Sequence, residues 1–469
     1  MKKIFSLKDL KKCNHLLFLG GKFLAQINKT ICTILDLPES IELDKCFGEK
    51  AVLLCGDIFQ FPPIVPRTPL YSSIVQLLGA QKNTSRKAAI KARLSTSPEM
   101  QGAQLFIQFR KVELTKQMRA AGDLQHTRLI DAMQKPEPNM DWIVEQLETQ
   151  YQTLSAELLK VDPAFMFCPI ATTGNRERAT ISDCISKAFT IQQQQHRFVW
   201  LKPIHVKGMT LSPGSVDSIY KRHEMFGSYF VIGAPAMLTQ NICCKSNLAN
   251  GTEVAYHSLV LSELEDARHI QDRILNTQPG EDIFLRYPPQ FIYVIITGSD
   301  PKNFENLTRI KDETVIPIGE SFKGNKVKAC VQENSGSTEI NSTCHGIDNR
   351  FSITMHKLLG KTIHRLCADL NDHSFRPTID FHGLFITLSR VKNLKHFARL
   401  PYQPDQDNLG HFRNLKPPKN LSIWLQSYAA DGHFNKDLLR AAEMEQSKEK
   451  CKRSTTTASP TTMVPPPKK

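Results

Sequence analysis

The sequence contains no apolar run long enough to cross a membrane. Across its 469 residues, nothing approaches the 18 or more consecutive apolar residues of a transmembrane helix. A basic start precedes Leu16-Leu17-Phe18-Leu19, but this apolar string falls short of the roughly 7–15 residues at the centre of a secretory signal. We therefore expect a soluble protein that has no membrane partner.

Paired cysteine motifs are also missing. None of the 12 cysteines forms a Cys-x-x-Cys pair, and the neighbouring thiols of Cys243-Cys244 make a poor shared metal site. This absence argues against a zinc ribbon and a disulfide framework, and no side chain is assigned as a metal ligand. Reduced thiols are typical of the cytosol and nucleus rather than of secreted proteins.

Acidic residues are fewer than basic ones. The chain has 46 Asp and Glu against 60 Lys and Arg, a formal net charge of +14. This excess raises the local concentration of polyanions and favours nucleic acid as a partner, although composition leaves an anionic membrane surface as an alternative. The length and the 41% apolar content suffice for two or three domains with cores of their own.

The spacing of apolar residues predicts an α/β fold. Residues 23–35 carry apolar side chains at helical spacing, and 51–55 form an unbroken apolar run that is typical of a strand buried on both faces of a parallel sheet. Residues 165–168 and 175–189 predict a second strand and helix, and 229–238 a further strand. We expect ligands at the carboxyl ends of such strands.

Two later segments differ in character. After an Asn250-Gly251 turn, residues 252–350 contain short strand-like pieces between Gly, Asn, Pro and Ser, which predicts a small β-rich insertion. The α/β pattern resumes at Phe351. Residues 447–469 have almost no large apolar side chain, so they cannot offset the entropy of ordering and are expected to form a disordered basic tail.

The string Gly56-Asp57-Ile58-Phe59-Gln60-Phe61-Pro62-Pro63 has the chemistry of a phosphate sensor. It follows the predicted strand 51–55, and its two prolines stiffen the loop. Asp57 could position a metal-bound water near phosphates, and the amide of Gln60 can both donate and accept a hydrogen bond. A strand-ending turn with an incidental glutamine is the structural alternative.

This string is similar to motif III of superfamily-one helicases, and the strings after it resemble the Pif-type family of DNA helicases in order and spacing over residues 45–400. The series continues with residues 68–71 and then with Phe109-Arg110 and 113–119, which are similar to motif IV. The next block consists of residues 233–238, Asn241 and 248–251. Residues 353–357 with Gly360 and Thr362 are similar to motif V, and residues 384–391 are similar to motif VI.

The resemblance implies two RecA-like P-loop NTPase domains, the first incomplete and the second carrying the β-rich insertion. The implied boundaries are 1–145 for the first domain, 160–251 with 351–430 for the second, and 252–350 for the insertion. ATP and Mg²⁺ would be the cofactors, with Gly56, Asp57 and Gly360 near the nucleotide. Single-stranded DNA and DNA junctions would be the partners.

The same resemblance implies that Gln60, Arg119 and Arg390 are catalytic, the two arginines as arginine fingers. A guanidinium suits that task because it stays charged and presents a planar fork to the oxygens of a transferring phosphoryl group. Outside such a motif series, an arginine on a helix is usually a solvated surface residue.

The resemblance also assigns four residues to DNA: Thr354, His356, Lys357 and Asn250. A cation and hydroxyl groups in a loop after a strand suit contacts to phosphates that do not depend on sequence. A core or surface histidine is the structural alternative for His356. Gly360-Lys361-Thr362 is not a phosphate-binding loop, because Met355 stands where that motif needs a glycine.

Three family features are absent. The chain has no Gly-x-x-x-x-Gly-Lys-[Ser/Thr] string, the Asp-Glu pair of motif II is missing after residues 16–19, and Leu358-Leu359 replace the Ser-Gln of motif V. We therefore expect an N-terminally truncated or degenerate copy of such a helicase. Helitron-type transposons carry related copies.

Two functions follow from the motif series. The first is an ATP-dependent DNA helicase that moves 5′ to 3′ on single-stranded DNA in repair, recombination or telomere maintenance, located in the nucleus or the mitochondrion. The second is a non-catalytic DNA-binding remnant that lacks the phosphate-binding loop and the motif II acidic pair. An unrelated basic scaffold protein is a third alternative. The sequence leaves the oligomeric state open.

Overall fold

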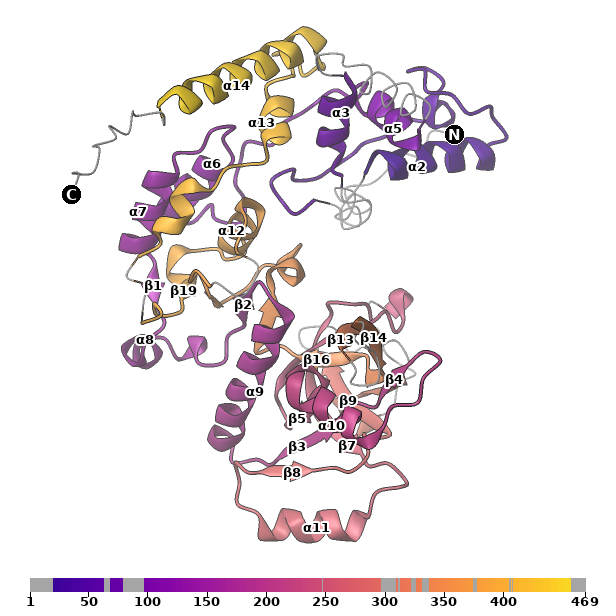
Figure 1. Cartoon of the computed structure of the whole chain (residues 1–469), viewed down its shortest axis with the longest axis vertical. Helices are drawn as coiled ribbons and strands as arrows, with labels where there is room; N and C mark the ends of the chain where they lie inside the picture. The colour runs from indigo at the N-terminus through magenta and orange to yellow at the C-terminus, as the bar shows by residue number, and fades with distance from the viewer. Residues whose placement is uncertain are drawn as a thin grey trace, which may run out of the picture. The chain divides into compact units, whose positions relative to one another are not determined.

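Two compact units make up the chain in the computed structural model (Figure 1). Unit 1 consists of residues 1–149, 380–389 and 409–469, and unit 2 of residues 150–379 and 390–408. Residues 380–389 and 409–430, which were predicted in the second domain, therefore belong to unit 1. The structure describes residues 20–62, 68–78, 97–246, 248–296, 309–310, 313–321, 326–330, 337–373, 378–404, 406 and 408–456.

The described residues of unit 1 form helices and no strand. The helices are α2 (Gly21–Ile34), η2 (Cys46–Glu49), α3 (Leu70–Leu78), α5 (Pro98–Phe106), α6 (Leu124–Met133), α7 (Met140–Gln150), α12 (Phe381–Leu388), η9 (Gly410–Asn414), α13 (Lys419–Leu425) and α14 (Lys436–Thr456). The helix predicted at 23–35 is confirmed as α2. In no helix of the described ranges does an apolar stretch reach the length that a membrane crossing needs.

The strand predicted at 51–55 is wrong. These residues have irregular backbone, and the side chain of Leu53 is 64% exposed. A strand needs a neighbour to accept its hydrogen bonds, and the described part of unit 1 provides none. The apolar string 16–19, which resembles the first strand of motif II, lies outside the described residues.

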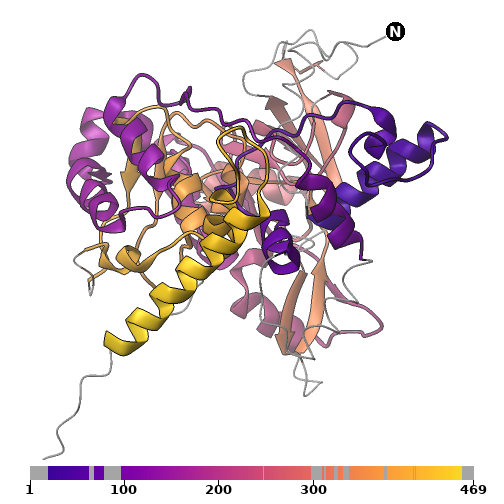
Figure 2. The ribbon, with the colours of Figure 1, turned by 90° about the horizontal axis from the view of Figure 1, so that it is seen from above.

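The tail predicted from residue 447 is wrong for its first ten residues, which are helical. Helix α14, the yellow helix of Figures 1 and 2, continues to Thr456. Its sequence is rich in Lys, Glu, Ala and Leu and contains neither Gly nor Pro, so helix propensity carries it past the predicted boundary. Residues 457–469 lie outside the described part.

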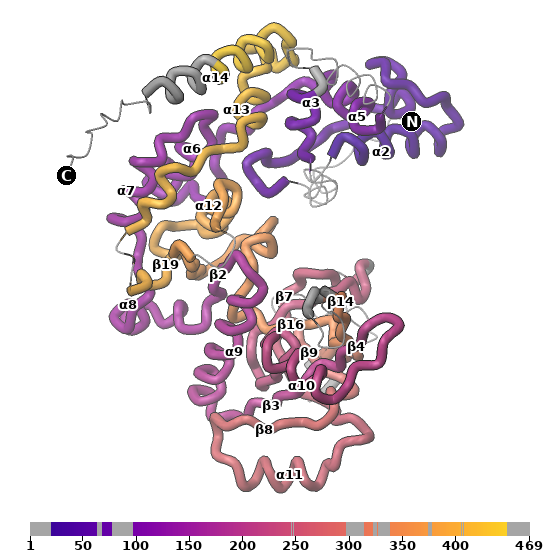
Figure 3. Tube along the Cα trace, in the orientation of Figure 1, coloured from indigo at the N-terminus to yellow at the C-terminus, as the bar shows by residue number. Residues whose placement is uncertain are grey.

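A five-stranded parallel sheet forms the α/β part of unit 2. Its strand order is β1 (Gln152–Thr153), β19 (Phe397–Arg399), β18 (Leu366–Ala368), β2 (Ile170–Thr172) and β17 (Ser352–Thr354). Figure 3 shows that these strands come from two segments of chain far apart in sequence. Five helical elements of the described residues lie beside these strands in sequence: α8 (Ala156–Val161), η3 (Pro163–Phe165), α9 (Asn175–Gln192), η7 (Met355–Leu358) and η8 (Leu394–His396).

The helix predicted at 175–189 is confirmed as α9, whereas the strand predicted at 165–168 is displaced. Asp162 accepts a hydrogen bond from Ala164 N and starts η3, so the chain turns where a strand was expected. Strand β2 begins only after Pro169, at Ile170. The side chain of Phe165 then packs in the core beneath the sheet.

The remainder of unit 2 is rich in β-structure, as predicted, but it starts earlier than residue 252. A six-stranded sheet has the order β15 (Cys344–His345), β12 (Ile316–Ser321), β9 (Phe291–Ile296), β7 (Glu253–Val260), β6 (Pro235–Leu238) and β16 (Ile347–Asn349). A three-stranded sheet has the order β5 (Gly227–Phe230), β3 (Arg197–Leu201) and β8 (Asp282–Phe284). A second three-stranded sheet has the order β13 (Lys326–Cys330), β14 (Ser337–Ser342) and β4 (Ile204–Val206). Strand β10 (Arg309–Ile310) pairs with β11 (Glu313–Thr314). Helices α10 (Pro213–Arg222) and α11 (Ala267–Asn276) and the short helices η4 (Glu224–Phe226) and η5 (Cys244–Ser246) lie among them in sequence.

Two glycines with a left-handed conformation lie in turns between strands of this β-rich part. The strand predicted at 229–238 is two strands, β5 and β6, because Gly233 adopts a left-handed conformation with φ of 77° between them. The turn predicted at Asn250-Gly251 is confirmed. Gly251, with φ of 95°, precedes β7, and Thr252 N donates to Ala249 O across the turn at 3.0 Å.

In unit 1, two glycines bring helices α2 and α5 into close contact. A Cβ added at Gly102 would collide with the carbonyl oxygen of Gly21, and one added at Gly21 would lie 2.5 Å from Glu99 O. The helix backbones therefore touch at a point where only glycine fits.

We predict that Gly102→Ala destabilises unit 1 by about 1–3 kcal/mol, because the backbones must separate to admit the methyl group. Helix propensity alone would make alanine more stable than glycine by about 1 kcal/mol inside a helix. A loss of stability would therefore report the steric clash. Urea unfolding followed by helical circular dichroism measures the change. Gly122→Ala is the matched control, since a Cβ there meets nothing within 4 Å. Equal effects of the two substitutions would contradict the close contact.

Candidate functional site

Helix α12 lies at the centre of the candidate site in unit 1. All eight of its residues are buried, as its run of Phe, Leu and Ile side chains requires. The polar backbone groups at the ends of a buried helix need partners. At the start of α12, Gly383 N donates to Asp380 Oδ1 at 2.7 Å, so Asp380 caps the helix.

The loop that contains Asp57 and Gln60 is ordered by its own side chains. Asp57 Oδ1 accepts a hydrogen bond from Phe59 N at 3.0 Å, and Asp57 Oδ2 accepts one from Gln60 Nε2 at 3.2 Å. Because a carboxylate can only accept, the amide nitrogen of Gln60 must face Asp57. The orientation of the predicted phosphate-sensing amide is thereby fixed by its neighbour.

Phe59 anchors this loop to helix α12. Its ring is buried against Phe385, with ring centroids 5.8 Å apart. Its carbonyl oxygen lies 2.8 Å from His382 Nδ1. Since a carbonyl only accepts hydrogen bonds, His382 carries a proton on Nδ1. The motif strings do not include His382, although a histidine at the start of an otherwise apolar run is a usable signal.

Arg119 binds the other end of α12. Its Nη1 donates to Ser389 O at 2.8 Å, which satisfies a carbonyl at the C-terminus of the helix. Burial lowers the pKa of the half-buried Arg119, and the nearby Asp57 carboxylate opposes this shift. The structure thus brings the predicted residues Asp57, Gln60 and Arg119 to one helix.

Tyr71, from the string 68–71, lies near the start of α12. Its side chain is 7% exposed, and burial raises the pKa of its hydroxyl to about 12, with a further contribution from the Asp380 carboxylate. Residues 68–71, a third string of the motif series, therefore also lie near helix α12, which belongs to the string that resembles motif VI.

Arg390 follows Ser389, the residue after α12, and is assigned to unit 2. Its side chain is 1% exposed, and its carbonyl oxygen accepts a hydrogen bond from Ile363 N at 2.9 Å. The residue is therefore fixed in the interior and not on a solvated surface. Its role as an arginine finger stays a prediction.

The residues assigned to DNA lie in unit 2, after strands of its sheets. Thr354 is the last residue of β17, and the short helix η7 (Met355–Leu358) follows it. His356 and Asn250 are exposed, whereas Leu358, which replaces a polar residue of the family, is fully buried. His356 and Lys357 thus follow a strand, as predicted, but they lie in a short helix, and Thr354 belongs to the strand itself.

Lys357 is half-buried and belongs to a charged cluster. Arg178 Nη1 lies 2.5 Å from Asp348 Oδ2, and Lys357 lies close enough to interact with both. Burial lowers the pKa of Lys357, Asp348 opposes that shift, and Arg178 and Lys361 reinforce it.

Lys361 joins the two strings assigned to DNA. Its Nζ donates to Gly251 O at 2.8 Å and lies 3.1 Å from Glu253 Oε1, while Arg350 Nη1 binds Glu253 Oε2 at 3.0 Å. The turn that carries Asn250 is thus tied to the chain just after η7. The sequence analysis rejected residues 360–362 as a phosphate-binding loop and missed this structural role.

Gly56 and Gly360, predicted near the nucleotide, are both exposed. Gly56 precedes the Asp57 loop in unit 1, and Gly360 adopts a left-handed turn in unit 2, with φ of 72°. The residues of the described ranges hold no group of three or more His, Cys, Asp or Glu that could bind a metal ion.

No protein-family model matches the sequence, and no curated protein matches it either. Solved structures of Pif1 helicases are similar to the chain. Pif1 helicase from Candida albicans is 12% identical and aligns over 88% of this chain and 75% of its own, with a TM-score of 0.46. Bacteroides Pif1 bound to single-stranded DNA is 15% identical over 93% and 80%, with a TM-score of 0.49.

A third solved structure, Bacteroides Pif1 in complex with ADP-AlF3 and single-stranded DNA, is 14% identical over 93% of this chain and 80% of its own, with a TM-score of 0.48. The residues that act are therefore sought in contacts within this chain. Its described residues form an α/β fold of two compact units, with the five-stranded parallel sheet in unit 2.

Proposed function

We propose that the chain is a DNA helicase of the Pif type that couples ATP hydrolysis to movement on single-stranded DNA. One observation carries the proposal: the Asp57-Gln60 loop and Arg119 are held by direct hydrogen bonds on helix α12, which belongs to the string resembling motif VI. Strings that are distant in sequence thus attach to one helix, with the Gln60 amide bonded to Asp57 and the Arg119 guanidinium close enough to Asp57 to interact with its charge. An amide and a guanidinium are groups that phosphoryl transfer uses.

The geometry suggests how nucleotide would act on unit 1. The Gln60 amide would meet the terminal phosphate, and Arg119 would stabilise the negative charge that develops on it. To do so, Arg119 would exchange its bond to Ser389 O for a phosphate oxygen. Because Arg390 follows Ser389 directly, this exchange would be felt by the second proposed arginine finger.

Single-stranded DNA would contact unit 2 through Thr354, His356 and Asn250. The formal net charge of +14 favours such a polyanion. The exposed His356 and Asn250 lie on segments that Lys361 ties together, so one strand of DNA could engage both. By the resemblance, movement is 5′ to 3′, and we place the protein in the nucleus, in DNA repair, recombination or telomere maintenance.

A second candidate is a DNA-binding relative of these helicases that does not hydrolyse ATP. Two sequence facts favour it: the chain has no Gly-x-x-x-x-Gly-Lys-[Ser/Thr] string, and no Asp-Glu pair follows residues 16–19. It predicts salt-sensitive binding of single-stranded DNA without turnover.

We predict that the purified chain hydrolyses ATP faster in the presence of single-stranded DNA, and that Arg119→Ala lowers this rate by about 10³-fold, the scale of an arginine finger. Arg119→Lys should rescue little, because an ammonium lacks the planar fork. Binding of DNA should persist in both variants. Steady-state phosphate release and fluorescence anisotropy with a labelled oligonucleotide measure the two properties.

Arg128→Ala is the control, since Arg128 is an exposed arginine of helix α6 in unit 1, outside the motif strings. DNA binding without any DNA-stimulated turnover of the wild-type chain would refute the helicase proposal and establish the second candidate. Parallel loss of turnover and DNA binding in Arg119→Ala, with a lowered melting temperature, would assign the residue to folding alone.

We predict that Lys361→Ala weakens binding of single-stranded DNA by about tenfold, equivalent to about 1.4 kcal/mol, because the Asn250 turn is released. A lysine that contacts phosphate also lowers the slope of log affinity against log salt by about 1. Since Lys361 is engaged with Gly251 and Glu253, we expect the slope to stay unchanged. Lys207→Ala, at an exposed lysine of unit 2, serves as the control. A reduced slope in Lys361→Ala would mean direct phosphate contact instead.

A further inference from the structure

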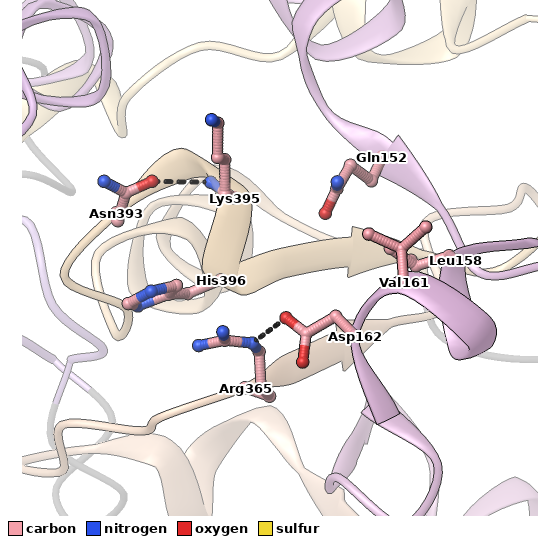
Figure 4. Close-up of a pocket in the computed structure, with 8 residues that line it drawn as sticks. All are labelled: Gln152, Leu158, Val161, Asp162, Arg365, Asn393, Lys395 and His396. Atoms are coloured by element: carbon pink, nitrogen blue, oxygen red, sulfur yellow. Dashed lines mark hydrogen bonds and ion pairs between the residues drawn. The ribbon is translucent and has the colours of Figure 1, made fainter. Parts of the chain in front are cut away.

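Unit 2 contains a hollow of about 430 Å³ at the amino edge of its parallel sheet (Figure 4). Gln152 begins β1, Arg365 directly precedes β18, and His396 directly precedes β19; all three line the hollow. Because the strands are parallel, this edge is opposite to the one at which Thr354 ends β17. The hollow is therefore separate from the segments proposed to bind DNA.

The hollow carries more positive than negative charge. Arg365 and Lys395 are permanent cations, and Asp162 is the one carboxylate among the lining residues. Arg365 Nε binds Asp162 Oδ2 at 2.5 Å, and Arg365 Nη1 donates to His364 O at 3.0 Å. Within the described part of the chain, Arg365 Nη2 and the exposed ammonium of Lys395 make no hydrogen bond and no ion pair. Both can serve a ligand.

Two uncharged polar groups add to these cations. Gln152 Oε1 is buried without a hydrogen-bond partner among the described residues, and such an amide can turn its nitrogen toward an anion. His396 is half-buried, with its ring centroid 5.5 Å from that of His364. Burial lowers the pKa of His396; Arg365, His364 and Lys392 lower it further, and Asp162 opposes them. The surroundings of His396 thus have an excess of positive charge, which an anion would offset.

The opposite wall of the hollow is apolar. Leu158 and Val161 of α8 form it, and the side chain of Val161 is 84% exposed. In Figure 4 these two side chains lie across the hollow from Arg365 and His396. An apolar wall beside an anion site suits a ligand that is charged at one end and flat and apolar at the other.

We propose that this hollow binds the phosphate group of a nucleotide. The free edge of the Arg365 guanidinium and the Lys395 ammonium would hold the phosphate oxygens, with His396 and Gln152 as further donors. Leu158 and Val161 would cover the sugar or base. The phosphate can belong to a free nucleotide or to the 5′ end of a DNA strand, and the chemistry of recognition is the same for both.

The test measures binding to the full chain by isothermal titration calorimetry. The probes are thymidine, thymidine monophosphate, and a short oligothymidylate with either a 5′-hydroxyl or a 5′-phosphate. We expect a phosphate-bearing probe to bind more tightly than its phosphate-free counterpart. Lys395→Ala and Arg365→Lys should each reduce that advantage by about tenfold, the loss of one charge-assisted bond.

Matched controls keep the result specific. Lys160→Ala removes an exposed lysine from α8 that does not line the hollow, and it should change nothing. Arg119→Ala should also leave phosphate binding at the hollow intact, which separates this proposal from the ATPase proposal. Arg365→Lys retains the charge beside Asp162, so loss of the fork is tested without exposing an unpaired carboxylate.

The outcomes are distinct. An advantage for thymidine monophosphate alone identifies a free nucleotide as the ligand, and one for the phosphorylated oligonucleotide identifies a DNA end; either supports the proposal. A rise in the pKa of His396 on phosphate binding, followed by NMR and assigned with His396→Gln, would support it too. Equal binding with and without phosphate, or an advantage that Lys395→Ala and Arg365→Lys leave unchanged, would overturn it.

Discussion

A fully buried helix whose two ends are polar is the constraint on which unit 1 depends. Helix α12 cannot expose its apolar side chains, yet its terminal N–H and C=O groups must be hydrogen-bonded. Asp380 satisfies one end and Arg119 the other. His382 of the same helix donates a hydrogen bond to the Phe59 carbonyl oxygen. Its burial thus determines where the residues proposed to respond to nucleotide must lie.

This arrangement makes the proposed chemistry and the stability of unit 1 interdependent. Arg119 is bound to a helix carbonyl in the present structure, and Gln60 is bound to Asp57. A phosphate that recruits either side chain would compete with an existing hydrogen bond for its N–H donors. Such competition is a physical route by which nucleotide could loosen or tighten the end of α12, and it requires no change elsewhere in the unit.

In unit 2 the direction of the parallel strands separates two kinds of polar surface. The carboxyl edge carries Thr354 and the segment that Lys361 ties to the Asn250 turn. The amino edge carries the hollow around Arg365 and His396. Because side chains that follow and precede a strand lie at opposite edges, these two regions lie on opposite edges of one short sheet.

Local patterns in the sequence predicted the helices at 23–35 and 175–189 and the β-rich insertion, because helix periodicity and turn residues act over a few positions. They failed at 51–55, since an apolar run does not reveal whether a partner strand exists.

The site was predicted in part. The motif strings indicated Asp57, Gln60 and Arg119, but not His382 or Lys361. The bond from His382 to Phe59 spans 323 residues, and that from Lys361 to Glu253 spans 108, so no local pattern encodes them.

Hydrogen–deuterium exchange with and without a slowly hydrolysed ATP analogue tests the central claim most directly. If the Asp57-Gln60 loop, Arg119 and α12 respond to nucleotide as one site, amide exchange in residues 57–60 and 381–389 should change together. Peptides from α11 should stay constant and serve as an internal reference. Unchanged exchange in both segments at saturating analogue would contradict the account.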